Sequence, residues 1–487
     1  MRRTILRLAA AAAFASFAAG CAPPDPLEHI REAAETAWGP KRTTENVTAA
    51  AATLRAAIAD PRFAKLPVED RAAAYSGAGW AALYLHDRDR SRAMLARSVE
   101  LAPADTFDRL QLARLQWDHD EKAAALSNAL RCVREGAQLG PEDSEFMWAM
   151  SRFTDPDAPD RIALLEALSV ADWNPRPAIA SHLKYQLALA RVRAGRINGL
   201  HEIVQGIELP DLIVMLRSDK RFDSAVDRDS LVFDAMAAAN LQVNRLERPV
   251  ADPPAADRDT ADLLRAMLVA GRSQQVATLS AAALAHAGRD AEPRDVASVL
   301  EQQSQALLRL GRIPDAVAAQ EKAAAISLDG AVNVNQTLDL GGLYCDLGRG
   351  EDAARAARRV EANINPFGRV VQSMIEHCAA TLTGDKVAAA RALAYLEAHK
   401  QERAPLYLDA LLRENRMDAA AAAFIATLKD DLTRGDTLAS VQTYAETPDL
   451  SPSAVAQAGR WKALLARRDV ANAIDAVGRI ETYAISP

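Results

Sequence analysis

Apolar residues recur along this chain at helical spacing, and short turns interrupt the pattern. A glycine-arginine turn, or a close variant of it, separates two helical patterns six times, and alanine-rich sequence resumes after each turn. Glycine or asparagine suits the position that follows a helix, where the backbone turns left-handed. Each turn therefore predicts two antiparallel helices. The predicted turn residues are Gly195, Gly271, Gly311, Gly348, Gly384 and Asn415.

The turns from Gly271 onward recur at intervals of 40, 37, 36 and 31 residues. Intervals of this size are typical of helix-pair repeats. One helix pair cannot bury its own apolar face, so successive pairs must stack. The pattern therefore predicts an all-α fold, a solenoid of helix pairs arranged in two arrays.

Around these turns, small and large apolar residues occupy set positions, and in this respect the units resemble tetratricopeptide repeats (TPR). In such repeats small residues let the two helices touch, and large ones fill the space to the next unit. An earlier unit matches too, although its turn is the polar segment 86–89. The resemblance implies a TPR-like superhelix. The residues that carry it, and that we expect at packing positions, are Tyr75, Gly79, Leu95, Leu307, Ala316, Tyr344, Ala353, Leu393, Ala420 and Phe424.

Two proline-rich breaks interrupt the helical pattern. Residues 247–258 predict a linker between an N-terminal and a C-terminal array, and the break within 155–177 interrupts the first array. The expected parts are a signal peptide at 1–20, a lipidated cysteine and tether at 21–35, an N-terminal helical repeat array at 36–246, the linker at 247–258, a C-terminal TPR-like array at 259–430, and C-terminal capping helices at 431–487.

One short segment is used twice in the chain. Asp60-Pro61-Arg62-Phe63 and Asp219-Lys220-Arg221-Phe222 share their aspartate, arginine and phenylalanine. We expect both segments to form the same loop, in which the phenylalanine is seated after the end of a helix.

The N-terminus carries a different pattern. Three arginines precede an apolar run from Leu8 to Ala19, which Gly20 and Cys21 follow. A basic region, a short apolar run and small residues predict a secretory signal peptide. The segment from Ala18 to Cys21 resembles the lipobox of bacterial lipoproteins, with alanine where leucine is usual. The resemblance implies that Cys21 is acylated and becomes the mature N-terminus. The alternative is an ordinary secretory signal, cleaved near Ala19 or Gly20.

Residues 22–26 contain three prolines and predict an extended tether behind the lipid anchor. Acyl chains supply membrane affinity, at about 0.8 kcal/mol per buried methylene. No later segment has some twenty consecutive apolar residues, so nothing else is expected to span the membrane. By resemblance, Ala22 after the cysteine implies the outer membrane rather than the inner one. We therefore expect a cell-envelope protein with a lipid anchor and a periplasmic body.

Composition and charge narrow the possible partners. The chain is 49% hydrophobic but only 5% aromatic, and alanine dominates its apolar residues, which favours helix packed on helix. Loss of the N-terminal segment removes three arginines, which would change the formal charge from −7 to −10. An acidic body without a basic run argues against nucleic acid, and against binding of anionic lipid by charge.

The remaining cysteines, Cys132, Cys345 and Cys378, have spacings that fit no zinc motif. Each lies in an apolar helical pattern, so buried free thiols are favoured, and a disulfide is the open alternative.

Motifs that carry catalysis are missing from the sequence. It contains no phosphate-binding glycine loop, no Gly-x-Ser-x-Gly and no His-Glu-x-x-His. Residues 118–120, Asp-His-Asp, could seat a metal, but a solvated capping turn is favoured. We therefore expect no catalytic residue, no metal, no cofactor and no enzymatic activity. Five of the six tryptophans lie before residue 180. They either form a binding platform or, for Trp80 and Trp117, fill the core between helices.

The predicted function is a membrane-anchored scaffold that binds another envelope protein or an extended peptide, with the membrane contacted through the lipid alone. The sequence does not identify the partner, because repeat proteins share a fold across unrelated roles. One alternative is a protein that binds a small ligand, peptide or glycan in a cleft near residues 155–180 and 247–258. Another is an accessory module of a cell-wall enzyme.

Overall fold

The computed structural model describes residues 27–173, 175–247, 254–288, 291–361, 364–401, 403–445, 448 and 451–486. The predicted signal peptide at 1–20, Cys21 and the proline-rich tether lie outside these residues. Within them, β-structure is limited to three isolated bridges. None of the described helices has the length and apolar run that a membrane crossing needs. The chain divides into two compact units, unit 1 up to Asn174 and unit 2 from Pro175.

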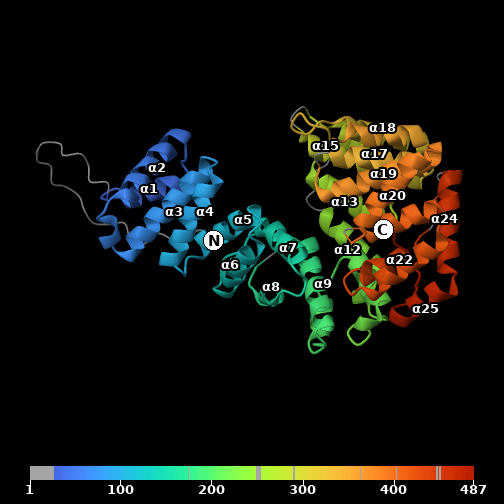
Figure 1. The fold of residues 1–487 in the computed structure, drawn as a ribbon, viewed down its shortest axis with the longest axis horizontal. Coiled ribbons are helices and arrows are strands. Elements are labelled where there is room, and N and C mark those ends of the chain that lie inside the picture. The colour runs from blue at the N-terminus through green and yellow to red at the C-terminus, as the bar shows by residue number, and fades with distance from the viewer. Residues whose placement is uncertain are drawn as a thin grey trace, which may run out of the picture. The chain divides into compact units, whose positions relative to one another are not determined.

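Unit 1 is built from α-helices and two 3-10 helices (Figure 1). Its elements are α1 (Ile30–Trp38), α2 (Thr44–Ala59), η1 (Phe63–Lys65), α3 (Val68–Tyr84), α4 (Arg88–Leu101), α5 (Thr106–Asp118), α6 (Lys122–Arg134), η2 (Pro141–Asp143), α7 (Ser144–Phe153) and α8 (Pro159–Val170). Its main helix contacts join α1 with α3, α3 with α4, α5 with α6 and α6 with α8. Unit 1 is therefore held by contacts between helices that are close in sequence.

The helices of unit 1 begin and end where local chemistry dictates. Asp87 and Asp105 cap α4 and α5, because each carboxylate accepts hydrogen bonds from backbone N–H groups of the first turn. His86 and Asp120 take the left-handed conformation between paired helices, with φ of 64° and 60°.

The predicted tether at 21–35 was too long, since α1 starts at Ile30. Its apolar face is buried against neighbouring helices, which favours helix over an extended tether.

Unit 2 contains the longer run of helix pairs. Its elements are α9 (Pro177–Arg193), α10 (Leu200–Val204), α11 (Pro210–Ser218), η3 (Lys220–Phe222), η4 (Leu231–Phe233), α12 (Ala235–Leu246), α13 (Arg258–Val269), α14 (Ser273–Ala285), α15 (Pro293–Arg309), α16 (Ile313–Ala325), α17 (Val334–Asp346), α18 (Gly350–Arg359), α19 (Pro366–Thr383), α20 (Lys386–Ala398), α21 (Ala404–Arg413), α22 (Met417–Lys429), α23 (Arg434–Ser440), α24 (Pro452–Leu465) and α25 (Arg468–Val477).

Helices α13 to α22 form five consecutive pairs. Each helix packs against the next one, and the first helix of a pair also contacts the first helix of a neighbouring pair, as α13 does α15 and α17 does α19. Figure 1 shows α17 to α20 lying side by side in this way. The predicted fold class, an all-α solenoid of helix pairs, is confirmed.

The boundary between the compact units differs from the predicted one. It lies at Asn174 and Pro175, in the other proline-rich break, and not at 247–258. Helices α12 and α13, which flank the predicted linker, pack together, and Val243 shares one apolar cluster with Ala256. Prolines end a helix, but they do not keep the flanking helices from packing. The ligand cleft expected near 155–180 and 247–258 stays a prediction.

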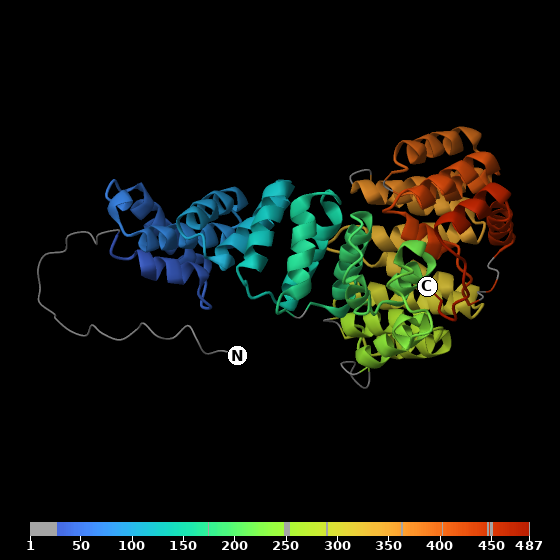
Figure 2. The same cartoon turned by 90° about the horizontal axis from the view of Figure 1, so that it is seen from below.

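The end of the chain also departs from the expectation of capping helices up to residue 487. Helices α23 to α25 are present, but α25 ends at Val477 and residues 478–486 form no helix. This segment returns to the first helices of unit 2, where Arg479 N–H donates to the Ser218 carbonyl (3.0 Å) and Ser486 N–H to the Val269 carbonyl (2.9 Å). Figure 2 shows the red C-terminal end beside the green helices of this region. Unit 2 is thus closed by its own last residues.

Candidate protein-binding surface

The six predicted turn residues all adopt the left-handed conformation. The five glycines have φ between 69° and 78°, and Asn415 has φ of 55°. A Cβ at Gly271 or Gly311 would meet nothing within 4 Å, so the backbone conformation and not crowding selects glycine there. The turn at Gly195 differs from the others, because the five-residue helix α10 follows it instead of a long alanine-rich helix.

The predicted packing residues lie between helices. Nine of the ten are buried and Tyr75 is half-buried. Gly79 on α3 and Leu95 on α4 come together, since a Cβ on Gly79 would lie 2.7 Å from Leu95 Cγ. The ring of Tyr344 is buried, but its hydroxyl donates to Oε1 of the exposed Glu321 (2.6 Å). These positions build the stack and do not themselves offer a surface to a partner.

A buried carboxylate joins three helices of unit 1. Asp108, in the first turn of α5, accepts hydrogen bonds from Trp80 Nε1 on α3 (2.8 Å), Ser76 Oγ on α3 (3.0 Å) and Ser98 Oγ on α4 (2.6 Å). Burial raises the pKa of Asp108 above its ordinary value, although the three donors oppose that shift. Trp80 is therefore a helix-joining residue, while Phe107, stacked on it at 4.7 Å, stays 62% exposed.

A groove crosses the surface of unit 1 between α2 and α4, with α3 as its floor. We call it the unit 1 groove. It has a volume of about 390 Å³, and alanines of α2 and α3 lie along it. Ile58 and Met94 add apolar bulk, and the exposed Arg55 and Arg90 form no ion pair with any described residue. The lining residues are Ala51, Arg55, Ile58, Ala59, Ala78, Ala82, Leu85, Asp87, Arg90 and Met94.

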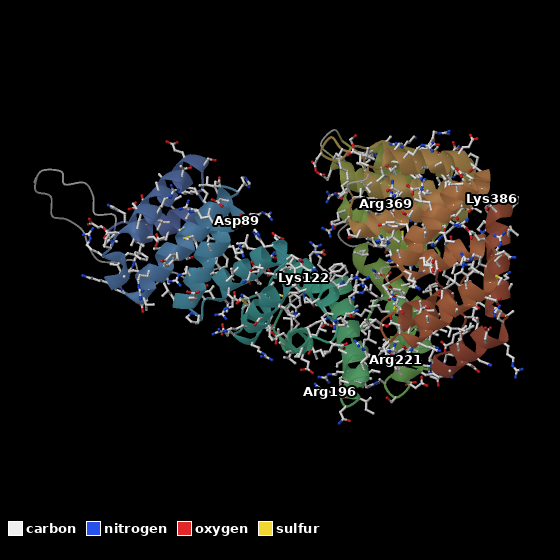
Figure 3. The ribbon with its side chains drawn as sticks, viewed as in Figure 1. Asp89, Lys122, Arg196, Arg221, Arg369 and Lys386 are labelled. Atoms are coloured by element: carbon white, nitrogen blue, oxygen red, sulfur yellow. A yellow bond between two sulfur atoms is a disulfide. The ribbon has the colours of Figure 1, made fainter. Side chains whose placement is uncertain are left out.

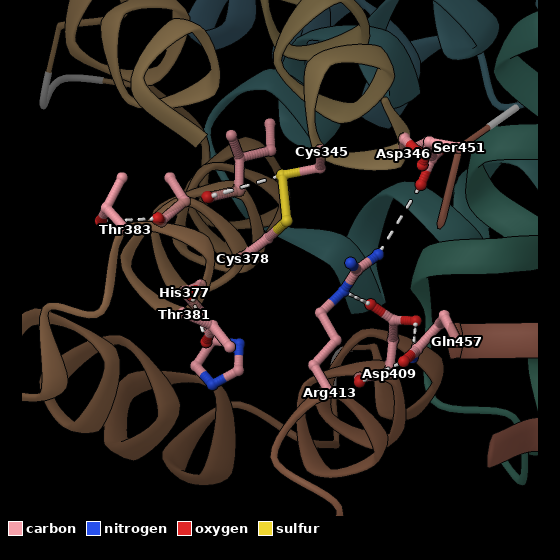
Figure 4. Close-up of a disulfide and its surroundings, with 12 residues drawn as sticks. Cys345, Asp346, His377, Cys378, Thr381, Thr383, Asp409, Arg413, Ser451 and Gln457 are labelled. Carbon is pink, nitrogen blue, oxygen red and sulfur yellow. Dashed lines mark hydrogen bonds and ion pairs between the residues drawn. A yellow bond between two sulfur atoms is a disulfide. The ribbon is translucent and has the colours of Figure 1, made fainter. Parts of the chain in front are cut away.

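In unit 2 a polar network joins α21 to α17 and to the start of α24 (Figure 4). Arg413 Nε donates to Asp409 Oδ2 (2.7 Å), and its Nη2 lies 3.7 Å from Asp346 Oδ1. Gln457 Nε2 donates to Asp409 Oδ1 (2.8 Å), while Ser451 Oγ donates to the Asp346 carbonyl. Burial raises the pKa of the Asp346 carboxyl, and Arg413 opposes the shift. The network fixes α24 on the array.

Two cysteines that were expected as free thiols form a disulfide. Cys345 on α17 and Cys378 on α19 are bonded, with their Cα atoms 6.1 Å apart (Figure 4). Their separation of 33 residues is close to one repeat, so the two cysteines lie on neighbouring first helices of stacked pairs. Cys132 is a buried free thiol as expected, and burial raises its pKa to about 12.

Two carboxyl groups interact across helices of unit 2, Glu301 on α15 and Asp339 on α17. Burial raises the pKa of Asp339 to about 7, and the negative charge of Glu301 adds to the shift. Glu301 itself accepts a hydrogen bond from Gln336 Nε2 (2.8 Å). The charge of Asp339 therefore depends on pH near neutrality.

The residues of the Asp-His-Asp segment at the end of α5 make separate contacts. Asp118 pairs with Arg88 (2.6 Å) and Asp120 with Lys122 (3.1 Å), while His119 Nε2 lies 3.5 Å from Asp89. In the described part of the chain no cluster of three potential ligands could hold a metal ion.

Four tryptophans of unit 1 lie on different helices, Trp173 lies after α8, and their surroundings differ. Trp38 is about half exposed, and Trp117 lies beneath Lys122 at 5.9 Å. Trp148 meets Phe153 edge to face at 5.9 Å. Such separate placement gives less support to a single aromatic platform than to the core interpretation.

No protein-family model and no curated protein matches the chain. Among solved structures, it is similar to the crystal structure of yeast Tom70, with a TM-score of 0.31 and 10% sequence identity over 92% of this chain and 99% of that one. A circular tandem repeat protein with novel repeat topology and enhanced subunit contact surfaces gives a TM-score of 0.10 and 11% identity, over 92% and 83% of the two chains. Both TM-scores are low, so the fold rests on the helix pairs of the chain itself.

Proposed function

We propose that this chain is an exported scaffold, anchored by a lipid on Cys21, whose helical-repeat body binds another protein of the bacterial cell envelope. Stacked helix pairs expose extended surfaces that suit this task and need no catalytic groups. The observation that carries the proposal is the unit 1 groove, an apolar channel with charged edges on a helical-repeat surface.

The groove suits an amphipathic helix as its occupant. Alanines along α2 and α3 let another helix approach closely, and Ile58 and Met94 would pack on its apolar face. Arg90 donates its backbone N–H to Asp87, but the guanidinium groups of Arg55 and Arg90 have no acidic partner among the described residues, so acidic groups on the incoming helix would complement them. The proposed partner therefore presents a helix with an apolar face and an acidic flank.

Export is supported by the disulfide between Cys345 and Cys378. Disulfides persist in oxidising compartments such as the bacterial periplasm and are rare in the reducing cytoplasm. The lipobox-like segment before Cys21 and the proline-rich tether add the anchor. The outer membrane is the proposed site of attachment.

The test is crosslinking in living cells of the source organism, with a tagged full-length chain. The chain is compared with Cys21→Ala and with the groove variant Arg55→Glu/Arg90→Glu. The matched control reverses two exposed charges on α20, Lys386→Glu/Arg391→Glu (Figure 3 labels Lys386). We expect one specific protein to be captured by the wild type and the control, and its capture to fall about tenfold or more in the groove variant.

Equal capture by the groove variant and the control would remove the groove from the proposal. A folded chain that captures nothing would contradict the scaffold function. For export, free thiols are blocked in lysed cells before and after reduction. A native chain whose Cys345 and Cys378 are already reactive before reduction would contradict residence in an oxidising compartment.

A further inference from the structure

The last described residues of the chain bind to unit 2 in the manner of an extended peptide. From Arg479 to Ile485 every second side chain faces the protein: Tyr483 and Ile485 are 7% and 0% exposed, while Ile480 is 50% exposed. Thr482 and Ala484 are exposed as well. A period of two residues is the geometry of a strand, with one face bound and the other in solvent.

Backbone hydrogen bonds hold this segment along its length. Arg479 N–H donates to the Ser218 carbonyl at the end of α11 (3.0 Å), and Ser486 N–H donates to the Val269 carbonyl at the end of α13 (2.9 Å). In between, Tyr483 N–H donates to the Thr443 carbonyl (2.8 Å), and Thr443 N–H donates to the Glu481 carbonyl (3.0 Å). The bonds come from both ends of unit 2, and they do not depend on the identity of the bound side chains.

Charge complementarity orients the segment. Arg217 Nε lies 2.9 Å from Glu481 Oε2, and Arg228 Nε lies 3.7 Å from Glu481 Oε1. Two residues before Glu481, Arg479 Nη2 lies 2.7 Å from Asp223 Oδ2. A basic side chain followed two positions later by an acidic one therefore meets opposite charges on the protein.

Two apolar side chains anchor the segment. Tyr483 and Ile485 belong to the apolar cluster of the first helices of unit 2, together with Leu212 and Phe222. The Tyr483 hydroxyl donates to Glu481 Oε2 (2.9 Å), so the ring is buried while its polar end is satisfied. The outward side chains at 480, 482 and 484 are exposed, so the outer face of the segment is open to solvent.

We propose that this cradle, formed by Arg217, Asp223, Arg228, Thr443 and Val269 with the apolar cluster beneath, is a binding site for extended peptides. Residues 478–486 are its built-in occupant. A partner would insert an extended segment of the same kind. At every second position this segment would carry an acidic residue, then an aromatic residue, then a branched aliphatic residue. This inference rests on the proposed scaffold function and adds a second contact to it. The partner competes with a tethered occupant, whose effective concentration is on the order of millimolar.

Peptide exchange in solution tests the site. The probe is a fluorescent synthetic peptide with the sequence of residues 479–486, and binding is followed by fluorescence anisotropy. The full-length variant Tyr483→Ala/Ile485→Ala weakens the occupant, and the matched control Ile480→Ala/Thr482→Ala changes outward residues only. We expect the first variant to bind the peptide at least about tenfold more tightly than the control does. A peptide with alanine at the tyrosine and isoleucine positions should not bind.

The variant Glu481→Lys serves where the double alanine variant does not fold. It places a positive charge before Arg217 and Arg228 but leaves both apolar anchors intact. Helix content measured by circular dichroism selects the folded variants. Absence of peptide binding in every folded variant would overturn the site, because the segment would then be held only as part of the fold. That result leaves partner capture through the unit 1 groove intact, so the two proposals fail separately.

Discussion

Phe63 in unit 1 and Phe222 in unit 2 follow the same loop, but different parts of the chain cover them. In both loops the aspartate accepts a hydrogen bond from the arginine backbone N–H, at 2.8 Å and 2.9 Å, and each phenylalanine meets a tyrosine ring of a neighbouring helix. Phe63 packs among α1, α2 and α3, which are close in sequence. Phe222 packs with Tyr483 and Ile485 from the far end of the chain.

The difference shows two ways in which a helical-repeat unit can be held together. In unit 1 the main contacts join sequence neighbours, so damage to one pair should stay local. In unit 2 the bond between Arg217 and Glu481 spans 264 residues, and the C-terminal segment joins the first helices to the last. Because these contacts join residues far apart in the chain, disruption of one end of unit 2 should also destabilise the other end. The two units should therefore differ in cooperativity while sharing one construction.

Alanine at the two phenylalanines is the largest test of this comparison. Each substitution removes a buried aromatic ring, which costs about 3–5 kcal/mol of unfolding free energy. We expect Phe222→Ala to raise hydrogen exchange both in α11 and in residues 478–486, and Phe63→Ala to raise it in α1 to α3 only. Mass spectrometry of exchanged peptides separates the regions. Phe367→Ala on α19, where the ring is half exposed, is the control. If hydrogen exchange rose in both variants only near the substituted residue, or in both at distant regions as well, the difference in cooperativity would be contradicted.

Reduction of the disulfide should affect unit 2 alone. A bond that closes a loop of 33 residues stabilises by about 3–4 kcal/mol through the entropy of the unfolded chain. The midpoint of urea unfolding of unit 2 should be lower in reducing than in oxidising buffer. In Cys345→Ala/Cys378→Ala the midpoint should be lowered by the same amount in both buffers. Cys132→Ala, which removes the free thiol of unit 1, is the control. An unfolding midpoint that is the same in oxidising and reducing buffer would contradict the contribution of the bond.

Removal of the Asp108 carboxylate should destabilise unit 1. In Asp108→Ala the donors on Ser76, Trp80 and Ser98 lose their common acceptor, at a cost of about 2–3 kcal/mol for the buried groups. Asp108→Asn should cost less, since its amide oxygen still accepts. Tryptophan fluorescence during urea unfolding measures both variants. Wild-type stability in Asp108→Ala would show that the three donors are solvated and not joined through Asp108.

The smallest expected effect is a pH dependence of unit 2. The pKa of folded Asp339 is raised to about 7, so the stability linked to its proton is complete below the ordinary aspartate pKa near 4 and is lost as pH rises to 7. Asp339→Asn should flatten the stability of unit 2 between pH 4 and 7 and stabilise it at pH 8. Urea unfolding at a series of pH values checks this. Parallel profiles for the variant and the wild type would assign the slope to other groups.

Several features of the fold were predictable because they depend on neighbours in sequence. Left-handed glycines, helix-capping aspartates and the small residue Gly79 against Leu95 follow from local conformation and from helical spacing. The alternation of inward and outward side chains from Arg479 to Ile485 was not visible in the sequence, because apolar Ile480 faces solvent while charged Glu481 faces the protein; capping helices were expected there.

Other features could not be predicted from local pattern. Asp108 reads as an ordinary acidic residue in the first turn of a helix, and only the packing of α3 and α4 makes it a buried acceptor. Cys345 and Cys378 read as apolar core residues, and their bond depends on how one pair rotates against the next. A linker and an inter-helix loop look alike in sequence, so the boundary between the units was placed in the wrong proline-rich break.

The sequence by itself determined that this chain is a stack of helix pairs, where most turns fall, and which residues lie between helices, because helix propensity, caps and left-handed turns act over a few residues. Only the tertiary structure decided where one unit ends, that two cysteines meet, and that the last residues return to Ser218 and Val269 to close unit 2. Such contacts join residues far apart in the chain, and they depend on the small rotations between stacked pairs, which accumulate along the array.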